Sequence, residues 1–215
     1  MKLTIVYDNE VYKKDMGLKS DWGFSCLIET TDETILFDTG AKGKILLHNM
    51  ASLDIDPSSI NKIAISHEHW DHKGGLKSLL PLIDDAEIYR LKKQNPDGRI
   101  RPVFVSTSCE ITEGVYTTGR LKGVVDEQSL VLKGKIGGYV LVGCSHPGVE
   151  QILNAAKQYG KIVGLIGGLH GFNKFSILKD LDLICPCHCT KYKKEIKELY
   201  PEKYVDGGVG KVIEI

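Results

Sequence analysis

One short segment of the chain concentrates side chains that bind metal ions. The stretch SHEHWDHKGGL, residues 66–76, places three histidines and two acidic residues within six positions. Side chains alternate in an extended segment, so His67 and His69 point the same way and can bind one ion through their ring nitrogens. Asp71 and His72 follow where KGGL lets the chain turn into a helix, so they can face a second ion. A metal ion bound by such a cluster can generate hydroxide at neutral pH. Two bound ions can also hold the attacking and the leaving oxygen of a displacement reaction.

Three further histidines follow apolar segments later in the chain. His146 comes after YVLVGCS, His170 after IVGLIGGL and His188 after LDLICPC. Side chains at neighbouring strand ends can point toward one place at the edge of a sheet. We therefore expect these histidines to belong to the same site as His67 and His69. One histidine after a strand is usually structural, but so many strand-end histidines are hard to explain without a ligand role. His48 lies in a helical pattern without such neighbours, and we expect it to be structural.

The segments that must position these residues are mostly short and strand-like. Runs of β-branched and apolar residues bounded by Gly, Asp or Pro recur along the chain, among them ETILFD at 33–38 and KIAISH at 62–67. Strands come early in hairpin-like succession and helices are then interleaved, which favours an α+β layered sandwich over a doubly wound sheet. The polar segment 92–101 is expected to be a surface loop. Helical patterns lie at 41–50, 73–82, 147–159, 173–180 and 191–200.

Length and composition limit the classes of function. The 215 residues suit one domain spanning 1–215, and 42% apolar with 26% charged residues is ordinary for a soluble globular protein. The apolar runs are strand-length, so we expect no membrane segment. Lys plus Arg equals Asp plus Glu at 28 each, so no basic excess favours a nucleic-acid partner. The N-terminus lacks the apolar core of a signal peptide, so we expect a cytoplasmic protein. The oligomeric state stays open, a homo-oligomer included.

The cysteines form one cluster, CPCHC at 185–189. A structural zinc site needs about four convergent ligands, and no second cysteine pair has a suitable spacing. In a cytoplasmic protein we expect reduced thiols. An extended segment would place Cys185, Cys187 and Cys189 on one face and His188 on the other, so these cysteines are expected to pack behind the histidine.

These motifs carry a family resemblance that covers nearly the whole chain. SHEHWDHKGGL resembles the signature of the metallo-β-lactamase superfamily, ILFDTG at 35–40 its acidic strand end, VGCSHPGV its third histidine motif and CPCHCT its last. The resemblance implies a four-layer αβ/βα sandwich with a one- or two-metal site at one edge of the paired sheets. Asp38 is implied as a residue near the site that does not itself bind metal. The implied ligands are His67, His69 and His146 for the first ion, and Asp71, His72 and His188 for the second.

One position departs from the superfamily pattern. Most dinuclear members have an aspartate between the third and last histidines that bridges both ions, whereas IGGLHGF offers His170 here. A neutral imidazole cannot bridge two metals as a carboxylate does. We expect His170 within the site, either as a terminal ligand, or facing substrate, or beside a site that holds only one metal firmly. Zinc is the expected ion, with manganese and iron as alternatives.

Further motifs narrow the resemblance to one branch. LTIVYDNE, WGFSCLIE, ILFDTG, GCSHPG, GGLHGF and PCHCT together are similar to the 7,8-dihydropterin-6-methyl-4-(β-D-ribofuranosyl)-aminobenzene-5′-phosphate synthase-like proteins, which are linked to tetrahydromethanopterin synthesis. The chain is compact for that branch, and substrate choice should lie in loops. Asn9, Trp22 and Phe24 are expected to contact substrate, the two aromatic rings by stacking on a flat ring. Core or loop anchoring is the alternative for the aromatic residues.

The sequence therefore predicts a metal-dependent hydrolase of a small, phosphorylated or pterin-like substrate, with Asp71 and His170 as catalytic residues. In the version that the branch implies, the enzyme is a synthase in which the metal assists loss of diphosphate. An iron-dependent redox enzyme on the same fold is one alternative, and redox-inert zinc would count against it. A non-catalytic metabolite-binding module is the other, and tight binding without turnover would be its mark.

Overall fold

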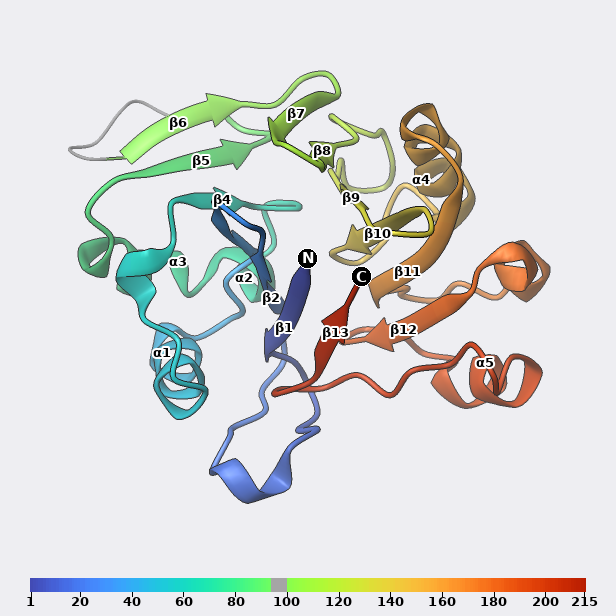
Figure 1. The fold of residues 1–215 in the computed structure, drawn as a ribbon, viewed down its shortest axis with the longest axis horizontal. Coiled ribbons are helices and arrows are strands. Elements are labelled where there is room, and N and C mark those ends of the chain that lie inside the picture. The colour runs from blue at the N-terminus through green and yellow to red at the C-terminus, as the bar shows by residue number, and fades with distance from the viewer. Residues whose placement is uncertain (94–99) are drawn as a thin grey trace. The chain divides into compact units, whose positions relative to one another are not determined.

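The computed structural model describes residues 1–93 and 100–215, which form two compact units. Unit 1 consists of residues 1–105 and 208–214, and unit 2 consists of residues 106–207 with Ile215. Each unit has its own sheet (Figure 1). Each also has its own core of buried apolar side chains. The single domain expected from the chain length stays a prediction.

Unit 1 is built on a sheet with strand order β13-β1-β2-β3-β4-β5-β6. Strands β13, β1, β2 and β3 pair antiparallel, as the expected hairpins require, and β3, β4, β5 and β6 pair parallel. The strands are β1 (Lys2–Tyr7), β2 (Ser25–Glu29), β3 (Thr34–Phe37), β4 (Lys62–Ala64), β5 (Ala86–Arg90), β6 (Ile100–Phe104) and β13 (Val212–Glu214).

Helices pack on this sheet through their apolar side chains. Leu46 and Met50 of one helix and Leu79 of another share a buried cluster with Ile63 and Ile88 of the sheet. Burial of such side chains stabilises each by about 1.5–3 kcal/mol. The helices of unit 1 are α1 (Gly43–Ser52), α2 (Trp70–Lys73) and α3 (Leu76–Leu79), with 3₁₀ turns at Lys14–Met16, Pro57–Ser59 and Leu80–Leu82.

Unit 2 is built on a sheet with strand order β12-β11-β10-β9-β8-β7. Its strands are β7 (Cys109–Thr112), β8 (Val115–Thr117), β9 (Leu130–Lys133), β10 (Gly138–Val142), β11 (Ile162–Gly168) and β12 (Leu183–Cys187). Strands β10, β11 and β12 run parallel, so their carboxyl ends lie at one edge of the sheet. Both β10 and β11 are buried throughout, which explains their continuous apolar sequence. Helices α4 (Val149–Ala156) and α5 (Lys193–Leu199) and 3₁₀ turns at Lys157–Tyr159 and Phe175–Asp180 complete the unit.

Most predicted elements lie where the apolar runs placed them, and the two mixed sheets with flanking helices confirm the α+β class. Three details differ. The helical pattern at 173–180 is a 3₁₀ turn, and strand β7 was not predicted, because Cys109 and Glu110 are exposed. Of the expected loop at 92–101, residues 94–99 lie outside the described residues, and Ile100 and Arg101 belong to β6 through pairing with β5. No helix in residues 1–93 and 100–215 has the length and apolar character needed to cross a bilayer.

Candidate metal centre

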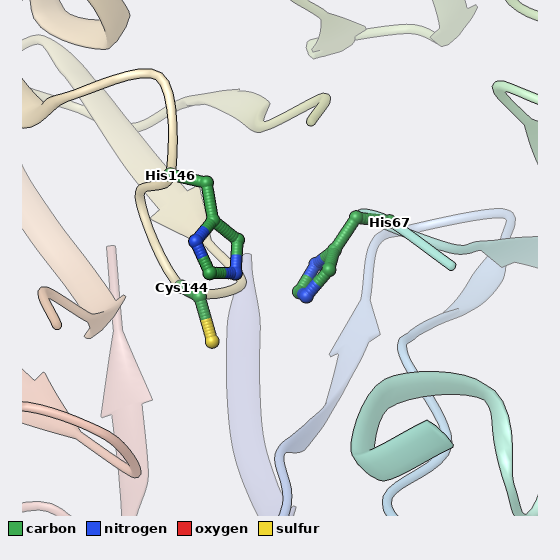
Figure 2. Close-up of side chains that lie close together, drawn as sticks. All are labelled: His67, Cys144 and His146. Carbon is green, nitrogen blue, oxygen red and sulfur yellow. The ribbon is translucent and has the colours of Figure 1, made fainter. Parts of the chain in front are cut away.

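The segment after β4 brings three predicted ligands of unit 1 together. His67, drawn in Figure 2, has its Nε2 atom 3.0 Å from Nδ1 of His69. The ring centroid of His67 lies 4.6 Å from that of His69 and 4.2 Å from that of His72. His67 and His72 are fully buried, and His69 is exposed. The three imidazoles therefore form one cluster with both a buried and an accessible side.

Hydrogen bonds on the far side of two rings fix their orientation. Ser66 Oγ lies 2.9 Å from His67 Nδ1, and Asp38 Oδ2 lies 2.7 Å from His72 Nδ1. The two oxygens of Asp38 also accept hydrogen bonds from the backbone N–H and the hydroxyl of Ser66, both at 2.7 Å. A partner at Nδ1 fixes the ring tautomer and leaves Nε2 as the ligand atom. Asp38 thus lies beside His72, one of the predicted ligands.

Asp71 is oriented by a tryptophan that the sequence had suggested for another role. Trp22 donates a hydrogen bond from Nε1 to Asp71 Oδ2 at 2.9 Å, although the Trp22 side chain is 51% exposed. The same carboxylate oxygen lies 3.9 Å from His72 Nε2. Asp71 is 7% exposed, so its carboxylate belongs to the edge of the histidine cluster. Trp22 therefore positions a predicted ligand. This role does not depend on what the exposed side of the indole ring contacts.

The two other predicted substrate contacts have structural roles in unit 1. Asn9 accepts a hydrogen bond from the backbone N–H of Gly23 at 3.1 Å, which fastens the loop that leads to Trp22. Phe24 is fully buried and packs edge-on against Phe37, with ring centroids 6.5 Å apart. A ring without exposed surface cannot stack on a substrate, so the structure corrects this assignment and places Phe24 in the core.

Glu68 lies between two predicted ligands, and no role was predicted for it. Its carboxylate accepts hydrogen bonds from Arg90 Nε at 3.0 Å, from Arg90 Nη2 at 2.5 Å and from Lys73 Nζ at 2.9 Å. Burial raises the pKa of Glu68, but these hydrogen bonds outweigh it and hold the pKa below its ordinary value. The charged carboxylate therefore ties the histidine segment to β5 and α2. An acidic residue between His67 and His69, which alternation places on the opposite side of an extended segment, was the available signal.

The predicted third histidine of the site is positioned by a buried carboxylate. Glu127 is fully buried, and its Oε1 accepts hydrogen bonds from the backbone N–H groups of Gly143, Cys144 and Ser145 at 3.0–3.1 Å. Its Oε2 accepts the N–H of His146 at 2.9 Å. Four charge-assisted hydrogen bonds fix the loop after β10, from which the side chains of Cys144 and His146 project in Figure 2. Sequence analysis missed Glu127, because it lies in the ordinary-looking polar segment DEQS.

The remaining histidines lie on the loops after β11 and β12. The ring centroid of the exposed His170 is 5.3 Å from that of His146. His188 is 4% exposed, and one of its ring nitrogens lies within 4.8 Å of Cys144 Sγ. The parallel strands β10, β11 and β12 thus deliver His146, His170 and His188 to one edge of the sheet of unit 2, as their positions after apolar runs had suggested.

The CPCHC cluster differs from its expected geometry. Strand β12 ends at Cys187, and His188 has a φ of 45°, which turns the chain out of the strand. Cys185 and Cys187 are fully buried with their sulfurs 3.8 Å apart, as packing residues should be. Cys189 does not share their face, because its Sγ lies 3.3 Å from Cys144 Sγ on another loop.

Strained backbone is concentrated at the candidate ligands. Positive φ is uncommon for residues with a Cβ and costs about 1–3 kcal/mol at each position. Among the described residues other than glycine, five have positive φ, and all but Asp54 lie at or beside the ligands: Asp38 at 57°, Ser145 at 62°, His170 at 46° and His188 at 45°. This strain is evidence for a functional site that does not depend on the sequence motif.

The donor set of unit 1 fits a divalent ion. Two nitrogens bound to one tetrahedral ion at about 2.0–2.1 Å are roughly 3.3 Å apart. The 3.0 Å between His67 Nε2 and His69 Nδ1 is close to that separation. The neighbouring carboxylate of Asp71 adds a hard oxygen donor. Zinc, iron and manganese all accept such imidazole and carboxylate ligands.

The family model described as the metallo-beta-lactamase superfamily matches residues 23–149, more than half of the chain. The chain belongs to this superfamily. A solved metal-dependent hydrolase of the beta-lactamase superfamily superposes with a TM-score of 0.78 at 24% identity, over 100% of this chain and 99% of that one. The structural likeness confirms the predicted metallo-β-lactamase type of fold. Because the superfamily binds divalent metals, a metal site is the expected use of the imidazoles described above.

Two relatives from Methanocaldococcus jannaschii match this member of the superfamily over most of its length. An uncharacterized protein is 28% identical over 263 positions, covering 99% of this chain and all of the relative. A protein named 7,8-dihydropterin-6-methyl-4-(beta-D-ribofuranosyl)-aminobenzene-5'-phosphate synthase is 27% identical over 265 positions, covering 91% of this chain and 90% of the relative. Both alignments exceed the 215 residues of this chain, so it has gaps where the relatives have additional residues. The branch resemblance and the compactness noted in the sequence are therefore confirmed.

Proposed function

We propose that the protein is a metal-dependent hydrolase that acts on a small, phosphorylated or pterin-like substrate in the cytoplasm. One observation carries the proposal: His67 and His72 are both held through Nδ1, by Ser66 and Asp38, with Nε2 left as the ligand atom. Metal-binding histidines almost always have such a partner on the other ring nitrogen, which fixes the tautomer and the ring orientation.

The proposed ligands combine this cluster with the histidines of the later loops. His67, His69 and His146 would hold one divalent ion, and Asp71, His72 and His188 a second one. The bound ions would supply Lewis acidity, which polarises an ester, amide or phosphoester toward attack. Zinc is the ion we propose.

The protein's own residues would then orient the substrate and accept a proton. The carboxylate of Asp71 is fixed by the Trp22 indole and would take the proton that the attacking water loses. His170 is exposed, and its ring lies beside that of His146, so it would face the substrate or bind one ion as a terminal ligand.

A hollow in unit 2 supports a substrate of modest size. It has a volume of about 430 Å³ and begins at Pro147, directly after the proposed ligand His146. Its lining includes the aromatic ring of Phe172, which suits a flat substrate, and Lys174, whose Nζ lies 3.8 Å from Oε2 of Glu150 in the same lining. Concave surfaces that combine an apolar ring with a few polar groups are typical of small-molecule sites.

A synthase is the second candidate, and the name of the relative from M. jannaschii favours it. In this version the substrates would be a dihydropterin diphosphate and a ribofuranosyl-aminobenzene phosphate, and diphosphate would leave. The two candidates share their ligands and differ in what attacks: water in the hydrolase and the aminobenzene compound in the synthase.

The first experiment is elemental analysis of the purified protein and of the variant His170→Ala. We expect two equivalents of zinc or manganese, falling towards one in the variant if His170 is a ligand. One equivalent in both proteins would assign His170 to the substrate side. The matched control is His48→Ala, since the His48 Nε2 atom instead lies 2.9 Å from the carbonyl oxygen of Gly17. A protein that takes up no metal even after incubation with zinc would contradict the proposal.

The metal-loaded protein would then be offered phosphodiesters, phosphomonoesters and the pterin diphosphate with its aminobenzene partner. Hydrolysis of simple esters supports the hydrolase. Release of diphosphate only when the aminobenzene compound is present supports the synthase. Bound iron whose absorbance responds to oxygen or reductant would instead favour a redox enzyme. Tight binding of one of these compounds without turnover would favour a metabolite-binding module.

A further inference from the structure

Two cysteines of unit 2 meet although their strands are not neighbours. Cys144 follows β10 and Cys189 follows β12, with β11 between these strands in the sheet. The two sulfur atoms are nevertheless 3.3 Å apart, and no disulfide joins them. Cys144 is 3% exposed, whereas Cys189 is partly exposed, so we expect a reagent from solvent to reach Cys189 first.

The approach of the two sulfurs depends on a glycine at the end of β11. A Cβ atom at Gly168 would lie 2.8 Å from Cys189 Sγ, 3.4 Å from Cys144 Cα and 2.3 Å from the carbonyl oxygen of Gly143. Any larger residue would fill the gap through which the two side chains meet. The absence of a side chain at Gly168 therefore leaves room for Cys189 Sγ beside Cys144.

Hydrogen bonds hold the residue that follows each cysteine. Ser145 donates from Oγ to the carbonyl oxygen of Gly168 at 2.8 Å. Thr190 Oγ1 accepts the backbone N–H of Leu169 at 2.9 Å and donates to the carbonyl oxygen of Cys187 at 2.7 Å. Both loops are thus fastened to the end of β11 or β12. The sulfurs are held near each other, which lowers the entropic cost of joining them.

We propose that Cys144 and Cys189 form a reversible disulfide when the protein meets a small-molecule disulfide such as oxidised glutathione. A disulfide bond is about 2.05 Å long, so the sulfurs need to approach by little more than about 1 Å, a shift that side-chain rotation can supply. The argument for this modification site does not rest on the proposed hydrolase activity, although Cys144 Sγ lies within 4.8 Å of a ring nitrogen of the proposed ligand His188.

The exchange has two balanced steps. The accessible Cys189 thiolate attacks one sulfur of the small disulfide, forms a mixed disulfide and releases the first small thiol. Cys144, as a thiolate, then attacks the Cys189 sulfur and releases the second small thiol. The two protein sulfurs lose two electrons in total, the small disulfide gains them, and the two cysteine protons end on the released thiols.

A second close pair provides an internal control. Cys185 and Cys187 have sulfurs 3.8 Å apart, but both side chains are fully buried. They are also two residues apart in one strand, where Cα atoms are roughly 6.6 Å apart and side chains run parallel. That separation is near the upper limit for a disulfide, so this pair should stay reduced. The exposed Cys109 serves as a control for simple thiol reactivity.

The test uses the full chain, stripped of metal with EDTA so that the result does not depend on the proposed metal site. The protein is incubated with oxidised glutathione, its remaining thiols are blocked with N-ethylmaleimide, and tryptic peptides are identified by mass spectrometry. We expect a bridged peptide pair that dithiothreitol separates. Because Cys185, Cys187 and Cys189 share one tryptic peptide, fragmentation of the bridged pair must identify the linked cysteine.

Variants make the assignment independent of fragmentation. Cys189→Ala and Cys144→Ala should each reduce the bridged pair at least tenfold, whereas Cys185→Ala should leave its yield unchanged. If Cys144 and Cys189 both react fully with N-ethylmaleimide while Cys109 acquires glutathione, the proposal is overturned. The measurement on the unaltered chain decides the matter even if a variant fails to fold.

Discussion

The hydrogen bond from Trp22 to Asp71 is the most direct place to test how individual residues support the site. Trp22→Phe keeps an aromatic ring but removes the N–H that Asp71 Oδ2 accepts. Loss of a partner that orients a ligand typically lowers metal affinity 10–100-fold, so we expect a decrease of about tenfold. Competition with a chromophoric zinc chelator measures this affinity.

The control for this variant is Trp70→Phe. Trp70 precedes Asp71 in the sequence and is also exposed, so the same substitution tests for a general effect of losing an indole. We expect its zinc affinity to stay within about twofold of that of the unaltered protein. Equal losses in the two variants would remove Trp22 from its positioning role.

Glu127 should matter for stability more than its sequence context suggests. Glu127→Gln replaces one carboxylate oxygen with an NH₂ group, which faces backbone N–H donors and cannot accept from them. Hydrogen bonds to charged groups contribute about 1.5–3 kcal/mol each, so we expect the free energy of unfolding to fall by about 2–4 kcal/mol. Urea denaturation measures the change, and the exposed Glu113→Gln should alter stability by less than about 0.5 kcal/mol.

The residues that sequence analysis found and those that it missed differ in one physical respect. Candidate ligands such as His67, His69 and His72 can be recognised from their residue type and their spacing in the sequence. Glu127 acts on His146, and Arg90 on Glu68, across 19 and 22 positions of sequence. Nothing local distinguishes such a residue from any other charged residue, because only the fold creates the hydrogen bonds that define its role.

Among elements, the pairing of β4 with β5 includes an ion pair that makes stability depend on pH. Lys62 of β4 lies opposite Glu87 of β5, with Nζ 3.1 Å from Oε2, and Tyr89 donates to the same oxygen at 2.9 Å. Burial raises the pKa of Glu87, but the hydrogen bonds from Tyr89 and Lys62 outweigh it and lower the pKa. The folded state therefore favours the charged carboxylate.

The sign of the pH effect follows from this lowered pKa. The contribution of Glu87 is fully present above the ordinary carboxyl pKa of about 4.3 and is lost as the pH falls through the lower pKa of the folded state. Glu87→Gln should be less stable than the unaltered protein at pH 7 by less than about 1 kcal/mol, because both side chains are partly exposed. Urea denaturation at pH 7 and pH 3 should show the gap closing at pH 3, and a gap that widens there would contradict the assignment.

Elements were predicted where burial makes the pattern unambiguous. The parallel strands β10 and β11 are buried throughout and have continuous apolar sequences, so sequence analysis placed them nearly residue by residue. Strand β7 lies at the sheet edge beside β8, and half of it is exposed. Edge strands need little apolar surface, so the residues of β7 resembled a loop.

For the whole molecule, bound metal should appear as thermal stability. A ligand that binds only the folded state at a hundred times its dissociation constant adds about 2.7 kcal/mol, which for a chain of this size raises Tm by about 5–10 °C. We expect this rise when zinc is added to the EDTA-treated protein. Differential scanning fluorimetry measures it, with His48→Ala as a control that keeps the full rise. A His72→Ala protein that gains as much from zinc would argue against the proposed ligands.

The whole chain is also compact relative to its relatives. Its 215 residues align over more than 260 positions with each of the two M. jannaschii proteins. The elements that carry the candidate ligands are present in this shorter chain, where they are joined by connecting segments. Such segments commonly determine substrate choice, which is why membership in the superfamily leads to a metal site more directly than to a substrate.

The left-handed residues Asp38, Ser145, His170 and His188 have a consequence for directed evolution. Glycine adopts this backbone without steric cost, so replacing any of these side chains with hydrogen relieves local strain. A library screened for heat resistance alone would therefore favour glycine at His170 and His188, where the proposed function needs an imidazole. The same library screened for catalysis would eliminate those clones, so selection for stability and selection for activity would favour different residues at these positions.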